Sequence, residues 1–407
     1  MDAAFGATVE EAIEGRREKL HQLSRFLWEN PELALEEVKA HNYLTDFLQS
    51  EGFSVQRNYL LPTAFRAEYC GKAEPGTKGG PTVAILCEYD ALPDIGHACG
   101  HNLIAECSVA AGVAIMEVLR KDNTLPGRVV VLGTPAEENC GGKELLIRKG
   151  AFEDIHVAMM AHPGKRNGLK YAFPATLQLT VRFTGRTAHA GASPWDGVNA
   201  LDAAVIAYMN ISLLRQQLKP TWKVSGVVIR AGKYPNIIPE ESELKYHLRA
   251  PNLDELDILR TKVESCFHSA GGATGCSVQI ERGTTYKHMI NNISLVQVFQ
   301  GYAEQMGVSF EDPDPGLLLT TGASTDAGNV SHTVPCIHPS FRLNSVGRNH
   351  TRDFQQAAGA DESQPLTRTV AKALALTAIR VMRDTKLLEE ARTEFQNSVD
   401  RDVNGAV

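Results

Sequence analysis

Carboxylate, thiol and imidazole side chains follow one another closely in the first third of the chain. The segment runs from Glu88 and Asp90 through a turn at Pro93 to Cys99 and His101. Thiolate, imidazole and carboxylate groups are the ligands that zinc and related transition metals use in proteins. The spacing therefore indicates a metal site, although a buried cysteine beside a histidine at a helix start would give the same pattern without a metal.

The elements around this segment place it at the end of a strand. Residues 82–87 form a short, β-branched apolar run, which is typical of a fully buried strand. Residues 103–119 are rich in Ala and Leu and predict a buried helix. Binding sites in open α/β sheets collect at the carboxyl ends of the strands, so the segment occupies a position where a site is expected.

Two further predicted strands also end on polar side chains. Residues 128–135 form a buried strand that leads to Glu137 and Glu138, and residues 155–163 form another strand that carries His162 near its end. Adjacent carboxylates repel each other unless a cation or solvent separates them. A solvated loop would explain the glutamate pair, and a buried histidine before a turn would explain the imidazole. Agreement among three strand ends favours one shared metal-binding site.

The pattern of elements changes at Pro174. Before it, strands alternate with helices, which predicts a mostly parallel α/β sheet covered on both faces. Residues 174–287 read strand-helix-strand-strand-helix-strand, which is the ferredoxin-like α+β order. The α/β pattern then resumes, so we expect one α/β domain built from residues 1–173 and 288–407, with residues 174–287 inserted into it.

The N-terminal segment is predicted to be helical. Residues 10–28 and residues 36–49 each carry apolar side chains at helical spacing, and Gly52 ends the second run. We therefore expect two helices before the first strand.

Composition excludes several classes of partner. The formal net charge of -7 argues against a nucleic-acid-binding protein, and no apolar run reaches the length of a membrane span. The first residues alternate Glu and Arg, unlike a signal peptide. Eight cysteines without a C-x-x-C pair are expected to be free thiols in a cytoplasmic protein.

Four motifs in this order resemble the two-metal peptidases and amidohydrolases of clan MH. They are Glu-Tyr-Asp-Ala-Leu-Pro at 88–93, Gly-His-Ala-Cys-Gly-His-Asn at 96–102, Thr-Pro-Ala-Glu-Glu at 134–138 and Met-Ala-His-Pro at 160–163. The Cys-Gly-His sequence is typical of the amidohydrolase branch. The resemblance covers nearly the whole chain. It implies a zinc-peptidase-like catalytic domain with an inserted lid and dimerisation domain.

The resemblance also implies a ligand set for two divalent metal ions. The matching positions are Cys99, His101, Glu138, His162 and His350. A thiolate ligand favours Zn²⁺, while mixed carboxylate ligation allows Mn²⁺ or Co²⁺. His338 precedes a proline in a predicted buried strand and competes with His350 for the last position, which we assign to His350. Glu88 departs from the wider clan, where this position is usually histidine, so the bridging ligand stays open.

Further roles follow from the same resemblance. Glu137, which precedes a ligand glutamate, matches the general base, and Asp90 matches the aspartate that orients a ligand and supports the base. His189 in the inserted domain matches a histidine that steadies the oxyanion, in relatives often from the other subunit. Asn236 and Arg249 match positions that bind the substrate's carbonyl or carboxylate.

The expected activity is hydrolysis of a small dipeptide by a metal-activated water. Resemblance favours β-alanyl or γ-aminobutyryl dipeptides of basic amino acids, such as β-alanyl-lysine, and a homodimer formed through the inserted domain. One alternative is an N-acyl-amino-acid or aminobenzoyl-glutamate amidohydrolase. A catalytically dead, metal-stabilised scaffold is another, but such a protein is expected to lose the base first, and Glu137 is present. A zinc nucleobase deaminase would need a Pro-Cys-x-x-Cys pattern that is missing.

Overall fold

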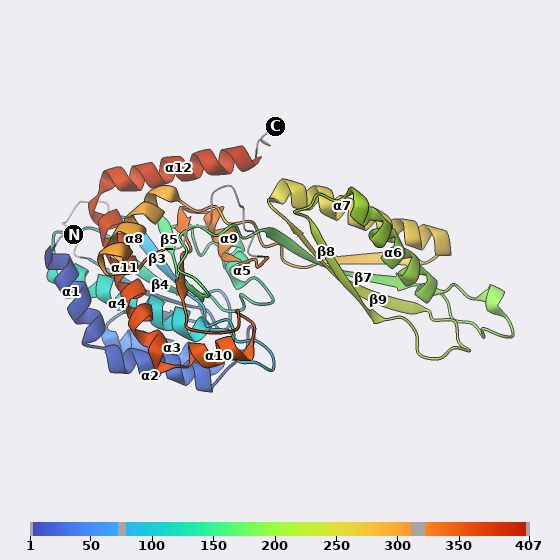
Figure 1. Cartoon of the computed structure of the whole chain (residues 1–407), viewed down its shortest axis with the longest axis horizontal. Coiled ribbons are helices and arrows are strands. Elements are labelled where there is room, and N and C mark those ends of the chain that lie inside the picture. The colour runs from blue at the N-terminus through green and yellow to red at the C-terminus, as the bar shows by residue number, and fades with distance from the viewer. Residues whose placement is uncertain (1–2, 72–78, 311–321, 404–407) are drawn as a thin grey trace. The chain divides into compact units, whose positions relative to one another are not determined.

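The structure, a computed structural model, describes residues 3–71, 79–310 and 322–403. The chain divides into two compact units (Figure 1). The first comprises Met1–Ala172, Met289–Leu319 and Thr325–Val407, and the second comprises Phe173–His288 and Thr320–Ser324. The second unit therefore interrupts the first in sequence.

A six-stranded sheet forms the centre of the first unit. The strands of this unit are β1 (Ser54–Arg57), β2 (Phe65–Cys70), β3 (Thr82–Cys87), β4 (Arg128–Gly133), β5 (Val157–Met159), β6 (His162–Gly164), β11 (Cys336–Ile337) and β12 (Ser340–Arg342). The sheet order is β1-β2-β4-β3-β5-β11, and β6 pairs with β12 in a separate two-stranded sheet. The pairs β3–β4, β3–β5 and β5–β11 are parallel, whereas β1–β2 and β2–β4 are antiparallel. Every residue of β3 is buried, as its apolar composition predicts.

Helices pack around this sheet (Figure 1). They are α1 (Ala3–Glu14), α2 (Arg17–Glu29), α3 (Val38–Glu51), α4 (His101–Lys121), α5 (Gly142–Arg148), α8 (Ile293–Gln305), α9 (Ala327–Ser331), α10 (Arg352–Ala358), α11 (Gln364–Arg383) and α12 (Thr385–Val403). The expectation that no apolar run reaches the length of a membrane span is wrong for α4, which alone among the described helices has that length and hydropathy. The helix packs inside the protein, where 94% of its apolar window is buried. It is the central core helix of this unit.

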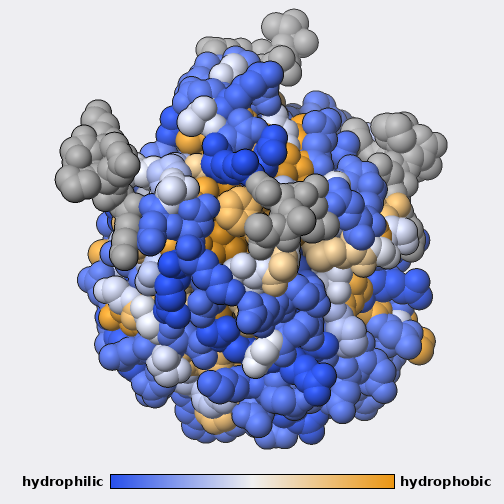
Figure 2. Space-filling model, turned by 90° about the vertical axis from the view of Figure 1, so that its left-hand side faces the viewer, coloured by the Kyte–Doolittle hydropathy of each residue, from blue (hydrophilic) through white to orange (hydrophobic). Residues whose placement is uncertain are grey.

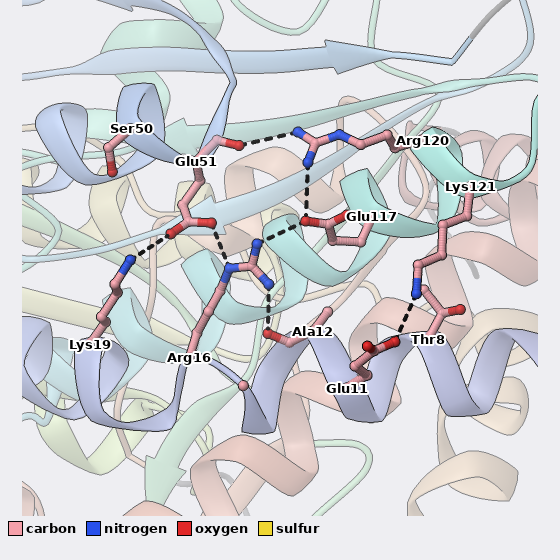
Figure 3. Close-up of a pocket in the computed structure, with 11 residues that line it drawn as sticks. Thr8, Glu11, Ala12, Arg16, Lys19, Ser50, Glu51, Glu117, Arg120 and Lys121 are labelled. Atoms are coloured by element: carbon pink, nitrogen blue, oxygen red, sulfur yellow. Dashed lines mark hydrogen bonds and ion pairs between the residues drawn. The ribbon is translucent and has the colours of Figure 1, made fainter.

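Two elements differ from the sequence prediction. The helix expected over residues 10–28 is two helices, because the chain turns at Gly15 and Arg16. Arg16 lies at this turn and binds Glu51 on α3 and Glu117 on α4 at 2.5 and 2.8 Å (Figure 3). The strand expected over residues 155–163 is β5 followed by β6, because the chain leaves the main sheet after Met159 and pairs next with β12.

The second unit is an antiparallel sheet covered by two helices. Its elements are β7 (Ala175–Thr184), α6 (Ala200–Leu214), β8 (Lys223–Arg230), β9 (Glu241–Ala250), α7 (Leu253–Thr274) and β10 (Ser277–Arg282), with short 3-10 turns at Pro194–Asp196 and Arg215–Gln217. The sheet order is β10-β7-β9-β8, so β8 is an edge strand. Alternate residues of β9 are buried against the helices, which is the period expected of a sheet with one covered face. The predicted fold class is thereby confirmed: a mostly parallel α/β unit with a ferredoxin-like insertion.

Apolar side chains are concentrated inside the two units. Each unit has its own cluster of buried hydrophobic residues. The face drawn in Figure 2 is mostly hydrophilic, with small hydrophobic areas between polar ones. Polar side chains thus cover most of this face, while the apolar side chains form the interior of each unit.

Candidate metal centre

The start of α4 carries the first pair of donors. The chain leaves β3 at Cys87, passes Glu88 and Asp90, and turns at Gly100, whose φ is 83°. A Cβ on Gly100 would lie 2.5 Å from Pro163 Cγ, so only glycine allows this turn to approach the next strand end. The turn places Cys99, which is 8% exposed, and fully buried His101 side by side.

Asp90 connects two of the strand ends. Its Oδ1 lies 3.0 Å from His101 Nδ1, and its Oδ2 accepts the backbone N–H of Glu138 at 3.0 Å. His101 Nδ1 donates to this carboxyl oxygen, and the ring thereby directs its Nε2 toward Glu88 Oε2 and Glu138 Oε1, at 3.4 and 3.7 Å. A histidine fixed in this way is typical of metal ligands, whose second ring nitrogen donates to a carboxylate.

The glutamate pair follows β4 on a turn with unusual backbone geometry. Ala136 has a φ of 63°, and its N–H donates to Glu37 Oε1 at 2.9 Å. Thr63 Oγ1 donates to the other oxygen of Glu37 at 2.7 Å. This buried glutamate therefore holds the turn that presents Glu137 and Glu138.

The remaining donors come from the start of β6 and from the turn before α10. His162 Nδ1 donates to the Pro163 carbonyl at 2.7 Å, which leaves its Nε2 lone pair 3.5 Å from Cys99 Sγ. His350 Nε2 lies 3.4 Å from Glu138 Oε1, and His101 Nε2 lies 3.7 Å from the same oxygen. The five predicted ligands are thus brought together, while His338 belongs to none of the donor groups found in the described chain.

These donors form overlapping groups that suit metal ions. In each group the ligand atoms lie within 4.8 Å of one another; the groups are Cys99–His101–His162, Cys99–Glu138–His350 and His101–Glu137–Glu138. Within the described residues, His101 Nε2 and Glu138 Oε1 are buried and make no hydrogen bond. Buried polar atoms without hydrogen bonds are costly, and a cation shared by sulfur, nitrogen and oxygen donors would satisfy them. The residues present therefore fit divalent metal ions.

The electrostatics of the site agree with this fit. Burial raises the pKa of the Glu137 carboxyl well above its usual value, and Glu88 and Glu138 raise it further. Burial also raises the pKa of the Cys99 thiol, as does Glu138, and burial lowers the pKa of His162 to about 4. A divalent cation would be the largest local charge here and would favour the carboxylate and thiolate forms.

Three predicted site residues lie in the second unit. His189 is exposed, and its Nδ1 accepts the N–H groups of Gly191 and Ala192 at 3.1 Å each, so its Nε2 carries the proton. The Asn236 carbonyl accepts the N–H of Ala190 at 3.0 Å, which places exposed Asn236 beside the His189 loop.

The third of these residues, Arg249, is half-buried on β9. Its guanidinium donates to the Gly322 carbonyl and lies 3.4 Å from Ser324 Oγ. Burial lowers the pKa of Arg249.

Sequence reasoning assigned no role to three buried residues around the centre, Glu37, Lys143 and Asp326, and left the role of Glu88 open. Glu88, Lys143 and Asp326 form a buried ion cluster. Lys143 follows Gly141 and Gly142 at the start of α5, but nothing in the local sequence indicates that its side chain is buried.

Comparison with known proteins identifies the family. Residues 84–376 match the model of peptidase family M20/M25/M40. Xaa-Arg dipeptidases from Mus musculus and Homo sapiens are 48% and 46% identical to the chain, each over 95% of it and 91% of the relative. A p-aminobenzoyl-glutamate hydrolase subunit from Escherichia coli (strain K12) is 25% identical over 96% of this chain and 95% of its own.

A solved structure shows the same fold. The dinuclear metal-binding peptidase of the M20 family from Bacillus subtilis has a TM-score of 0.65 at 18% identity, covering 93% of this chain and 99% of its own. The resemblance inferred from the motifs is confirmed by the family match and by the relatives. The chain belongs to peptidase family M20/M25/M40 and is a metallohydrolase that acts on amide bonds.

Proposed function

We propose that the chain is a dipeptidase that hydrolyses β-alanyl or γ-aminobutyryl dipeptides of basic amino acids, such as β-alanyl-lysine. The observation that carries the reaction is the convergence of thiol, imidazole and carboxylate donors beside Glu137. The substrate class is supported by the 48% identity to an Xaa-Arg dipeptidase over nearly the whole chain.

The metal ions would be held by the side chains of Cys99, His101, Glu138, His162 and His350. When bound, they supply Lewis acidity and lower the pKa of a water molecule toward neutrality. A thiolate among the donors favours Zn²⁺, with Mn²⁺ or Co²⁺ as alternatives. In His162, Nδ1 donates to the Pro163 carbonyl and Nε2 faces Cys99 Sγ. The imidazole ring therefore needs no rotation to present Nε2 to a metal ion.

Glu137 acts as the general base. It is 7% exposed and next to a ligand glutamate, where bound cations would favour its carboxylate form, and that form can take a proton from water and pass it to the leaving amine. Asp90 orients His101 and, through the Glu138 N–H, the glutamate turn. Asp90 thereby fixes the position of Glu137 relative to the metal-binding side chains.

Residues of the second unit bind and polarise the substrate. His189 presents an Nε2–H because its Nδ1 accepts two backbone N–H groups, and this donor would stabilise the oxyanion that forms during amide cleavage. One such donor is worth about 3–4 kcal/mol of transition-state stabilisation. Asn236 and Arg249 bind the substrate's carbonyl and carboxylate groups.

A homodimer through the second unit is supported by the exposure of β8. Val227, Val228 and Ile229 on this edge strand are 56%, 47% and 52% exposed. Helix α6 adds an exposed apolar row: Leu201, Val205, Tyr208, Met209 and Leu213. An apolar edge strand is a template for pairing with another chain, and a second copy pairing there would cover it.

All eight cysteines are free, which supports a reducing, cytoplasmic location.

An aminobenzoyl-glutamate or N-acyl-amino-acid amidohydrolase is the second candidate, favoured by the 25% identity to the Escherichia coli hydrolase subunit. A panel of β-alanyl-lysine, γ-aminobutyryl-lysine, acetyl-amino acids and aminobenzoyl-glutamate, assayed with added Zn²⁺ or Mn²⁺, separates the two. We expect cleavage of the basic dipeptides. Cleavage of the acetyl or aminobenzoyl substrates alone would establish the second candidate instead.

A further inference from the structure

Lys143 is a fully buried lysine beside the metal centre. Its Nζ donates to Glu88 Oε1 at 2.5 Å and to Asp326 Oδ1 at 2.6 Å, and all three side chains are 0% exposed. The backbone N–H of Lys143 also donates to Asp326 Oδ2 at 2.9 Å. Lysine is almost never fully buried unless it is paired, and here one ammonium group forms ion pairs with two carboxylates.

The local chain is built to bring this lysine close to the strand end. Helix α5 starts after Gly141, which has a φ of 67°. A Cβ on Gly142 would lie 1.7 Å from the Pro135 carbonyl oxygen, so no other residue fits there. The glycine pair therefore lets the first turn of α5 press against the segment that ends in the Glu137–Glu138 pair.

The ammonium lies where a cation would be expected. Glu88, Glu137 and Asp326 are buried and offer oxygen atoms within 4.8 Å of one another. Three carboxylates at this separation repel unless a positive charge lies among them. Lys143 provides that charge from within the chain.

The pairing also determines which oxygen of Glu88 is available. Oε1 is engaged by Lys143, whereas buried Oε2 makes no hydrogen bond within the described chain and lies 3.4 Å from His101 Nε2. Asp326 differs, because both of its oxygens accept from Lys143. Glu88 thus presents one oxygen toward the centre, and Asp326 presents none.

We propose that Lys143 is a positioning residue that acts as a tethered cation: its ammonium holds Glu88 with Oε2 toward the His101 side of the metal centre and keeps a further divalent ion out of the Glu88, Glu137 and Asp326 group. This role rests on the proposed metal-dependent function. It makes a prediction of its own, because a divalent ion can take the place of the ammonium among these carboxylates once Lys143 is replaced.

The test counts divalent ions bound per chain in Lys143→Met, after dialysis against Zn²⁺ or Mn²⁺ alone. Lys372→Met is the matched control. Lys372 on α11 is also buried and binds two carboxylates, Glu10 and Glu14 on α1. We expect Lys143→Met to bind one more ion per chain than the native protein and to lose at least tenfold in kcat. The double variant Lys143→Met/Asp326→Asn, which removes one carboxylate as well, should return to the native count.

An unchanged ion count in Lys143→Met would overturn the tethered-cation role, whatever its kcat. If that variant does not fold, Lys143→Gln, whose amide still donates to one carboxylate, is measured in its place with the same criterion. A native protein that binds no divalent ion would refute the proposed function separately. The count in the variant relative to the native protein would still decide the role of Lys143.

Discussion

The imidazole of His101 and the carboxylate of Asp90 are hydrogen-bonded inside the protein, with 3.0 Å between Nδ1 and Oδ1 and both side chains buried. The second oxygen of Asp90 accepts the N–H of Glu138. One side chain therefore sets the orientation of a donor on α4 and the position of the glutamate turn after β4. This link is how two separate strand ends become one site.

Asp90→Asn should weaken metal binding. An asparagine offers one acceptor oxygen, whereas His101 Nδ1–H and Glu138 N–H both need an acceptor at this position. Partners of metal-bound histidines typically contribute about 10–100-fold to affinity, so we expect a Zn²⁺ affinity lower by that factor in competition with a chromophoric chelator. Asp154→Asn, which alters an Arg66 pair elsewhere, is the control. Native affinity in Asp90→Asn would contradict the orienting role.

The buried carboxyl of Glu106 should make stability depend on pH. Its Oε2 accepts from Gln364 at 2.8 Å, its Oε1 makes no hydrogen bond in the described chain, and burial raises its pKa from 4.5 to about 8. The folded state therefore holds this proton more tightly than the unfolded state. Its contribution to stability is complete below pH 4.5 and is lost as the pH rises to about 8.

Glu106→Gln tests this directly, because glutamine can keep the bond from Gln364 without titrating. We expect the native free energy of unfolding to fall across this range by up to about 1.4 kcal/mol per pH unit more steeply than that of the variant. Urea unfolding at pH 5, 6, 7 and 8 measures both slopes. Parallel curves for the two proteins would show that the pKa of Glu106 is not raised in the folded state.

The edge strand β8 should carry the subunit interface. Val227→Glu places a charge on an apolar edge residue that is 56% exposed, and burying that charge against a second copy would be unfavourable. Val38→Glu is the matched control, since Val38 is 55% exposed on α3 of the other unit. Light scattering should give the mass of two chains for the native protein and the control, and of one chain for Val227→Glu at micromolar concentration. A native monomer would exclude the dimer.

The sequence predicts those features that depend on local pattern. The buried strands β3 and β4 and the core helix α4 are recognisable from apolar runs, and the second unit from its order of elements. The break at Gly15 and Arg16 was missed because the apolar spacing continues across it, and the turn depends on partners on α3 and α4. Likewise, β6 is separate from β5 only because β12 pairs with it.

Some residues of the candidate site could also be predicted from local sequence pattern, and others could not. Cys99, His101, Glu138 and His162 follow predicted strand ends, so their proximity could be anticipated, whereas His350 was assigned by resemblance. Glu37, Lys143 and Asp326 have no local signal of this kind, because each acts through residues far away in the sequence. Supporting groups of a site are set by tertiary packing and become visible only in the folded chain.

The role of Glu137 is tested by Glu137→Gln, measured for bound metal and for hydrolysis of β-alanyl-lysine on the same preparation. Glutamine keeps the size of the side chain but cannot accept the proton of the attacking water, so we expect near-native metal content and a kcat lower by about 10²–10⁴-fold. Glu138→Gln, which alters a ligand, should instead lose metal. Wild-type-like turnover in metal-loaded Glu137→Gln would show that this carboxylate is not the base.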